Sequence, residues 1–137
     1  MIQVIYGKRG SGKTKRMIDM ANSLISTAKG SIVFIDDDNR CMLSLHHDIR
    51  YINAGEYEVN SSPMLYGFLC GILAEDFDIE HIFLDGLPLL CGADSVADME
   101  DFFQKVKDFA NRHDLTVTMG ISGPADDVPT FLNGHMI

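Results

Sequence analysis

The sequence predicts a single three-layer α/β/α domain, built on a mainly parallel sheet of four or five strands. Three features of the chain lead to this fold class. Its 137 residues are the length of one domain. Strand-like apolar segments alternate along it with segments of helical spacing. The strand-like segments are continuously apolar, as expected of parallel strands covered on both faces. We expect residues 1–137 to form one domain, with 125–137 as a short C-terminal tail.

The charge of the chain is unevenly distributed. Eleven Lys and Arg stand against twenty Asp and Glu, for a net charge of −9. This balance argues against a nucleic-acid partner, because phosphate backbones are held mainly by Lys and Arg. The first sixteen residues nevertheless carry five basic side chains and no acid. An anion is therefore expected to bind near the N-terminus.

The expected compartment is the cytoplasm. Met1 leads directly into an apolar strand pattern, without the charged leader and cleavage site of a secreted protein. The longest apolar stretch, 63–74, is too short to cross a bilayer, so no membrane insertion is expected. The three cysteines are odd in number and widely spaced, which favours reduced thiols.

The first half of the chain begins with a β-branched and aromatic strand over 2–6. Apolar residues then recur at helical spacing from Met17 to Ala28, and Gly30 is predicted to mark the helix end. A second buried strand is expected over 31–35, followed by three aspartates. A short edge strand is expected over 50–54.

The second half continues the same alternation. The expected elements are a helix starting at Ser61-Ser62-Pro63, a strand over 81–84, a helix over 95–112, a strand over 115–121 and a short helix near Pro129. Gly67 and Gly71 share one face of the first of these helices, so we expect them to pack closely on the sheet or on another subunit. The apolar segment 86–91 is expected to fold over the end of the sheet, to meet another chain, or simply to fill the core.

Residues 7–14 match the phosphate-binding pattern G-x-x-x-x-G-K-[ST] at every fixed position. Glycines let the backbone turn its N–H groups around phosphate oxygens. Lys13 is expected to contact the β- and γ-phosphates, and the Thr14 hydroxyl to ligate Mg²⁺. The helix that follows points its positive dipole end at the same anion. The predicted nucleotide contacts in this loop are Gly7, Lys8, Arg9, Gly10, Ser11, Gly12, Lys13 and Thr14.

With this loop the sequence resembles the P-loop NTPase superfamily. A second motif of that superfamily, an apolar strand ending in an aspartate, matches residues 81–85, His-Ile-Phe-Leu-Asp. The resemblance implies that Asp85 holds Mg²⁺ together with Thr14. The placement of the strands looks like the minimal RecA-like or additional-strand arrangement. That arrangement implies that the strand over 115–121 lies between those over 2–6 and 81–84.

The resemblance also bears on the group that orients the attacking water. Many P-loop ATPases carry a glutamate directly after the metal-binding aspartate, but Gly86 occupies that position here. RecA-like proteins place the carboxylate at the end of the second strand, where this chain has Asp36, Asp37 and Asp38. Asp37 or Asp36 is the expected catalytic carboxylate. The alternative is that the three aspartates form only a solvated acidic turn.

The remaining polar and charged residues that could belong to the site are interpreted from their positions in the chain. Ser122, or alternatively Thr118, is the polar residue expected to sense the γ-phosphate near the end of the last strand. Arg40, Arg50 and Arg112 are interpreted as surface charges. Rapid turnover would then require an arginine finger from a neighbouring subunit or partner, and without one hydrolysis is expected to be slow. His46 and His47 are interpreted as a loop pair.

The expected nucleotide is ATP, because the chain lacks the Asn-Lys-x-Asp pattern with which Ras-like proteins read guanine. The leading hypothesis is a slow Mg²⁺-dependent ATPase that acts as a switch or as a subunit of a larger assembly. Its loop region is loosely similar to the twitching-motility ATPases. A small-molecule or nucleotide kinase is the alternative, and a nucleotide-binding module without hydrolysis is a third possibility.

Overall fold

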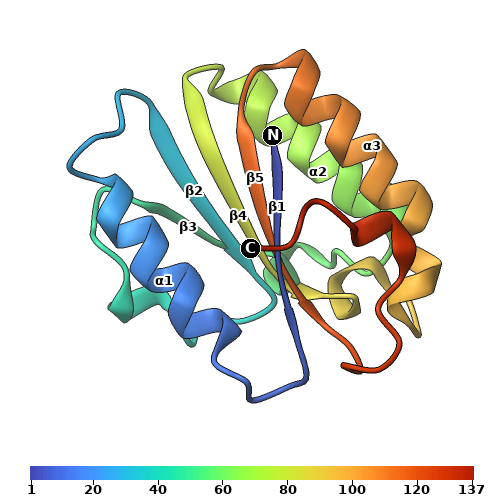
Figure 1. The fold of residues 1–137 in the computed structure, drawn as a ribbon. Helices are drawn as coiled ribbons and strands as arrows, with labels where there is room; N and C mark the ends of the chain where they lie inside the picture. Colours follow the sequence, from blue (N-terminus) through green and yellow to red (C-terminus); the bar gives the residue numbers. More distant parts are fainter.

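The computed structural model describes all residues from 1 to 137 and has the predicted α/β architecture. Five strands form one all-parallel sheet, accompanied by three α-helices (Figure 1). The strands are β1 (Ile2–Gly7), β2 (Ser31–Asp36), β3 (Arg50–Asn53), β4 (Ile79–Leu87) and β5 (Thr116–Ser122). The helices are α1 (Lys13–Leu24), α2 (Ser62–Glu75) and α3 (Glu100–Arg112).

The strands lie in the order β1-β5-β4-β2-β3. The last strand in sequence, β5, therefore lies between β1 and β4, as the resemblance implied. The strand predicted over 50–54 is confirmed as an edge strand, β3. Because the sheet is parallel, the carboxyl ends of β1, β5, β4 and β2 meet at one edge. Polar residues that follow these four strands are thereby brought together.

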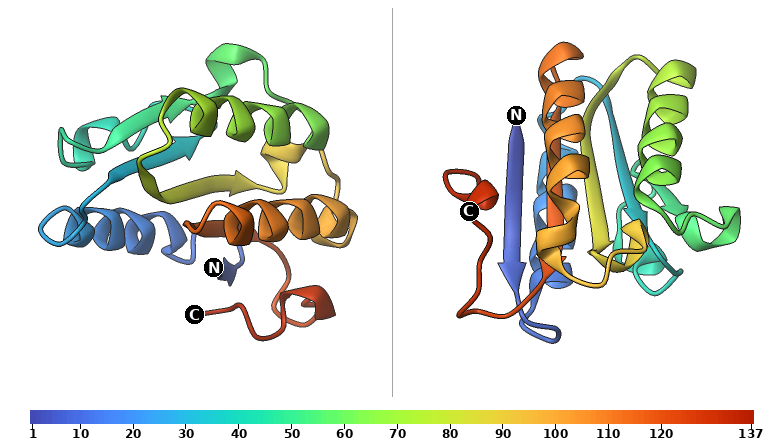
Figure 2. Two further views of the ribbon diagram at one scale, coloured as in Figure 1. Left: turned by 90° about the horizontal axis from the view of Figure 1, so that it is seen from above. Right: turned by 90° about the vertical axis from the view of Figure 1, so that its right-hand side faces the viewer.

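Helices cover both faces of the sheet. Side chains alternate between the two faces along each strand, and both faces are apolar, so each must be covered. Helix α1 packs through Met17 and Ala21 on Ile5, Phe34 and Phe83. Helices α2 and α3 pack on the opposite face, in a second and larger apolar cluster. Figure 2 shows α1 and α2 on opposite sides of β2 and β4.

The predicted end of the first helix is wrong. Helix α1 ends at Leu24, a turn follows at 25–27, and Gly30 lies just before β2. Gly30 is needed for a close approach instead, since a Cβ there would lie 2.2 Å from the Asp78 carbonyl oxygen. Its N–H donates to the Glu80 carboxylate at 2.8 Å.

Helix α2 begins as predicted, with the Ser61 hydroxyl accepting a hydrogen bond from the Met64 N–H. Gly67 and Gly71 were expected to pack on the sheet or on another subunit, and the first of these alternatives is wrong. No atom lies within 4 Å of a Cβ added at either glycine, so both face outward. The helix instead contacts the core through a stripe formed by Leu65, Leu69, Ile72 and Leu73.

Two predicted helices are shorter or divided. The helix expected over 95–112 consists of a 3₁₀ turn at Val96–Met99 followed by α3, and the tail holds a 3₁₀ turn at Thr130–Leu132.

The tail then runs beside β1, where Met136 pairs with Val4 (Figure 2). It thereby covers the middle of an otherwise open sheet edge at Val4. None of the helices has the length and apolar character needed to cross a membrane.

Candidate functional site

A cavity of about 610 Å³ lies at the carboxyl edge of the sheet. Four segments line it: residues of the loop after β1, the end of β2, the end of β4, and Ser122 of β5. Its walls carry four cationic side chains, Arg9, Lys13, Lys15 and Arg40, and two carboxylates, Asp37 and Asp85. A net positive cavity in a protein of net charge −9 is suited to an anion.

The loop between β1 and α1 has the backbone that the motif predicts. Gly10 and Gly12 have φ angles of +82° and +89°, in the left-handed region where a side chain is strained. Gly7 has a different role, since a Cβ there would lie 2.6 Å from the Ser11 hydroxyl oxygen. Helix α1 begins at Lys13, directly after Gly12, so its free N–H groups lie beside the cavity.

The ammonium of Lys13 is held within this loop. Its Nζ donates a hydrogen bond to the Lys8 carbonyl oxygen at 2.9 Å, and only 9% of the residue is exposed. Burial lowers the pKa of Lys13, although the Asp85 carboxylate acts in the opposite direction. The loop therefore fixes one partly desolvated positive charge at the cavity wall.

Thr14 and Asp85 meet although 71 residues separate them in the sequence. The Thr14 hydroxyl donates to Asp85 Oδ2 at 2.6 Å, and the Gly86 N–H donates to Oδ1 at 2.9 Å. Gly120 of β5 leaves space for this carboxylate, because a Cβ there would lie 2.6 Å from Asp85 Oδ1. A hydroxyl and a carboxylate at the cavity wall are oxygen ligands of the kind that Mg²⁺ prefers.

The three aspartates at the end of β2, Asp36 to Asp38, occupy different environments. Asp36 is fully buried, Asp37 lines the cavity, and Asp38 does not belong to the cavity wall. Burial raises the pKa of Asp36 to about 7, and the nearby Asp37 and Asp85 carboxyls contribute in the same direction. Gly86, next to Asp85, has a φ angle of +81°, which favours glycine, and a Cβ there would be in ordinary contact with Asp36 and Asp37 at 3.4 Å.

Arg40 is exposed, as expected of a surface charge, and its side chain also lines the cavity. Its Nη2 lies 3.0 Å from Asp37 Oδ1 and 3.4 Å from Asp36 Oδ1. Its Nε lies 3.2 Å from Asp38 Oδ1. These carboxylates raise the pKa of Arg40, with Asp36 the main cause. In the sequence, only its position two residues after Asp38 could have indicated that Arg40 contacts this acidic segment.

Of the two candidates on β5, only Ser122 lines the cavity. Thr118 is buried inside the sheet layer, where its hydroxyl donates to Gln3 Oε1 at 2.9 Å and contacts His81 Nε2 at 2.7 Å. Burial lowers the pKa of His81 to about 4, so the imidazole is uncharged near neutral pH. Thr118 therefore has a structural partner rather than a place at the cavity.

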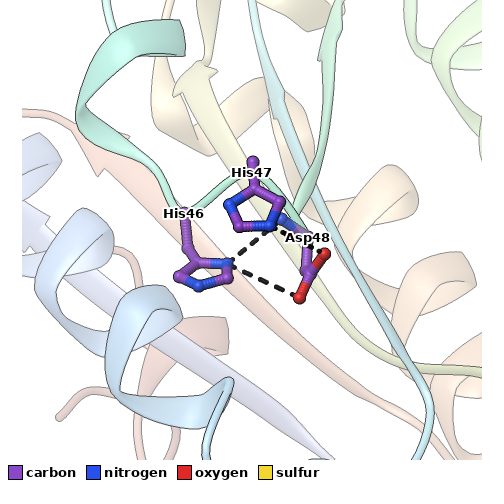
Figure 3. Close-up of side chains that lie close together, drawn as sticks. All are labelled: His46, His47 and Asp48. Atoms are coloured by element: carbon purple, nitrogen blue, oxygen red, sulfur yellow. Dashed lines mark hydrogen bonds and ion pairs between the residues drawn. The ribbon is translucent and has the colours of Figure 1, made fainter.

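A second polar cluster lies in the loop before β3, where His46 and His47 were expected as a loop pair (Figure 3). Asp48 joins them, with its carboxylate 3.8 Å from His46 Nδ1 and 3.4 Å from His47 Nε2. All three residues are exposed, and the Asp48 N–H donates to His46 Nδ1 at 3.1 Å. The cluster shares no residue with the cavity.

The segment after Asp85 is mainly core. Leu87, Leu90 and Cys91 are buried, and Leu89 is exposed at the cavity wall. These three buried residues belong to the main apolar cluster, so the segment mostly fills the core, as the third of its expected roles.

A comparison of the sequence with models of known protein families gave no match, and neither did a comparison with curated proteins.

Proposed function

We propose that this protein is an ATP-binding P-loop NTPase that hydrolyses ATP slowly with Mg²⁺, as a switch or as a subunit of a larger assembly. The contact of Thr14 with Asp85 carries the proposal. It joins the end of the phosphate loop to the strand-end aspartate at the same cavity wall as Lys13. An ammonium, a hydroxyl and a carboxylate at one wall suit a magnesium-bound triphosphate.

The strand order supports the finer fold assignment, a three-layer α/β/α P-loop domain. β5 lies between β1 and β4, and β2 follows β4 on the other side. This order places the loop after β1 and the ends of β4 and β2 around one crevice. Open parallel sheets bind ligands in such crevices at the carboxyl ends of their strands.

Each residue around the cavity has a proposed role in phosphoryl transfer. The loop amides and Lys13 bind the phosphates, and Ser122 contacts the terminal phosphate. Thr14 and Asp85 hold Mg²⁺, which neutralises charge on the phosphate oxygens when bound. Asp37 orients the attacking water, because it lines the cavity whereas Asp36 is buried behind it. Asp36 keeps this segment in place through its contacts with Arg40 and the Asp37 N–H.

The experiment is an assay of phosphate release from Mg-ATP. Wild type should release phosphate without an acceptor, and Lys13→Ala should abolish the release. Lys29→Ala is the matched control, because Lys29 is exposed and does not line the cavity. Phosphate release that is unchanged in Lys13→Ala contradicts the proposal. ATP binding without phosphate release indicates a binding module that has lost hydrolysis.

A small-molecule or nucleotide kinase is the second candidate. The cavity continues from Asp85 along Leu87, Pro88 and Leu89, which offers an apolar wall to an acceptor. The same assay separates the two functions when candidate acceptors are added. ADP production that requires an acceptor favours the kinase, and production without one favours the ATPase.

A further inference from the structure

We infer that Arg40 contacts the terminal phosphate of the bound nucleotide and so supplies from within the chain the arginine that was expected from a partner. The inference rests on the proposed function, because it assigns a further residue to the same site. Arginine at the transferred phosphate stabilises the charge that develops in phosphoryl transfer. The alternative is that Arg40 only neutralises the acidic end of β2.

The strand order places Arg40 and Lys13 on opposite sides of Ser122 and Asp85. Lys13 follows β1 and Arg40 follows β2, and β5 and β4 lie between these strands. Those two central strands carry Ser122 and Asp85, respectively. All four side chains line the same cavity. An anion held by Lys13 beside Asp85 therefore has Arg40 at the farther wall.

The guanidinium of Arg40 is anchored and still has capacity for another acceptor. Its Nε and Nη2 contact the carboxylates of Asp36, Asp37 and Asp38. Its other terminal nitrogen, Nη1, makes no hydrogen bond, and 56% of the side chain is exposed. A planar guanidinium can bind acceptors on two edges at once. Nη1 is thus available to a phosphate oxygen while the anchoring contacts stay in place.

The backbone around Arg40 is also held in place. The Arg40 N–H donates to Asp38 Oδ1 at 2.9 Å, and the Tyr51 hydroxyl donates to the Asp38 carbonyl oxygen. Cys41, the next residue, is buried against Asp36. A side chain that is positioned before the ligand arrives loses less conformational freedom on binding. These contacts distinguish Arg40 from an arginine that is free in solvent.

The test compares two nucleotides that differ by the terminal phosphate. Calorimetry with Mg²⁺ measures the dissociation constants of ADP and of a non-hydrolysable ATP analogue for wild type and Arg40→Ala. We expect Arg40→Ala to weaken the analogue by about tenfold or more, the usual worth of a charge-assisted hydrogen bond, and to leave ADP within about twofold. Arg50→Ala is the matched control, since Arg50 is half-exposed and pairs with Glu75 outside the cavity.

Arg40→Lys provides a second variant in case the alanine variant does not fold. Lysine keeps the positive charge near Asp36 but lacks the planar guanidinium with its several N–H donors. We therefore expect Arg40→Lys also to weaken binding of the ATP analogue and not of ADP. Equal losses for both nucleotides, or no loss for either, overturn the inference and leave the proposed function standing. A wild-type protein that binds neither nucleotide overturns the proposed function, and the inference with it.

Discussion

Two polar residues on one face of β4 have opposite environments. His81 and Asp85 are four residues apart, and both lie on the face that α1 covers, with Phe83 between them. His81 belongs to an internal chain of hydrogen bonds that runs through Thr118 to Gln3. Asp85 belongs to an edge cluster with Thr14 and the acidic end of β2, beside the cavity.

The difference between these regions concerns charge more than burial. His81 and Asp85 are 9% and 4% exposed, so both are buried. The internal chain consists of neutral groups that satisfy one another, and burial holds the pKa of His81 at about 4. The edge cluster concentrates carboxylates and cations at a cavity wall. A neutral chain contributes stability, whereas a charged cluster beside a cavity is suited to a ligand.

The largest expected effect is on the pH dependence of stability. Because burial raises the pKa of Asp36 from 3.8 to about 7, the folded protein binds more protons than the unfolded chain between these values. The stabilising contribution of protonated Asp36 is complete below the unfolded pKa and is lost as the pH rises through 7. Asp36→Asn does not titrate, so its stability relative to wild type should rise by up to about 4 kcal/mol from pH 4 to pH 8. Urea unfolding at a series of pH values measures this difference.

His81 serves as a control, because its contribution to stability changes with pH in the opposite direction. Its folded pKa of about 4 lies below the unfolded value of 6.5, so its contribution is lost as the pH falls between these values. The stability of His81→Phe relative to wild type should therefore decrease as the pH rises from 4 to 7. Parallel pH profiles for the two variants contradict the assignment of opposite environments.

The second effect concerns the metal. Asp85→Asn removes the charge that favours Mg²⁺ at the edge cluster while it preserves the shape of the side chain. We expect the gain in ATP affinity on adding Mg²⁺ to fall by about 100-fold, or about 2.7 kcal/mol. Calorimetric titrations with Mg²⁺ and with a chelator measure this gain. If Asp85→Asn keeps the full magnesium dependence, the metal is held elsewhere.

Gly120 lies on β5 between the two regions. A Cβ at this position would lie 2.6 Å from both Asp85 Oδ1 and Met17 Sδ. Gly120→Ala should therefore reduce the free energy of unfolding by about 2 kcal/mol and also weaken the magnesium dependence of ATP binding. Thermal unfolding and calorimetry on the same sample test both parts. A variant as stable as wild type would show that β5 shifts to accommodate the added methyl group without any loss in the free energy of unfolding.

The smallest effect is expected from the internal chain. Thr118→Val leaves His81 Nε2 and Gln3 Oε1 without their buried hydroxyl partner. We expect the free energy of unfolding to fall by about 1–2 kcal/mol, with ATP affinity unchanged. Denaturant unfolding and nucleotide titration measure the two quantities. A Thr118→Val protein with weakened ATP binding contradicts the separation of the two regions.

Much of this arrangement could be predicted from local sequence patterns. The motif over 7–14 predicted the left-handed glycines and the start of α1, and the strand-end pattern predicted the place of Asp85. Ser122 could be chosen over Thr118 because it lies at the end of its strand, where parallel strands present their polar residues. These features depend on residues close together in the sequence.

The remainder depends on contacts between distant segments, which local patterns do not record. Glycine commonly follows helices, so the sequence predicts a helix stop at Gly30, but glycine is required there by the close approach of the Asp78 carbonyl oxygen. Arg40 lies in an irregular loop without periodicity, so its position at the cavity can be found only from the three-dimensional structure. Gly120 makes room for a carboxylate on another strand, and no spacing in the sequence predicts this contact.

We propose that the edge cluster and the loop after β1 bind the phosphates of a nucleotide. Calorimetric titration of Mg-ATP into wild type, Lys13→Ala and Lys29→Ala tests it most directly. Wild type and Lys29→Ala should bind with the same affinity, and Lys13→Ala should bind at least about 100-fold more weakly, because it loses the charge-assisted contact. Equal affinity in Lys13→Ala and wild type, or no binding by wild type, would contradict the claim.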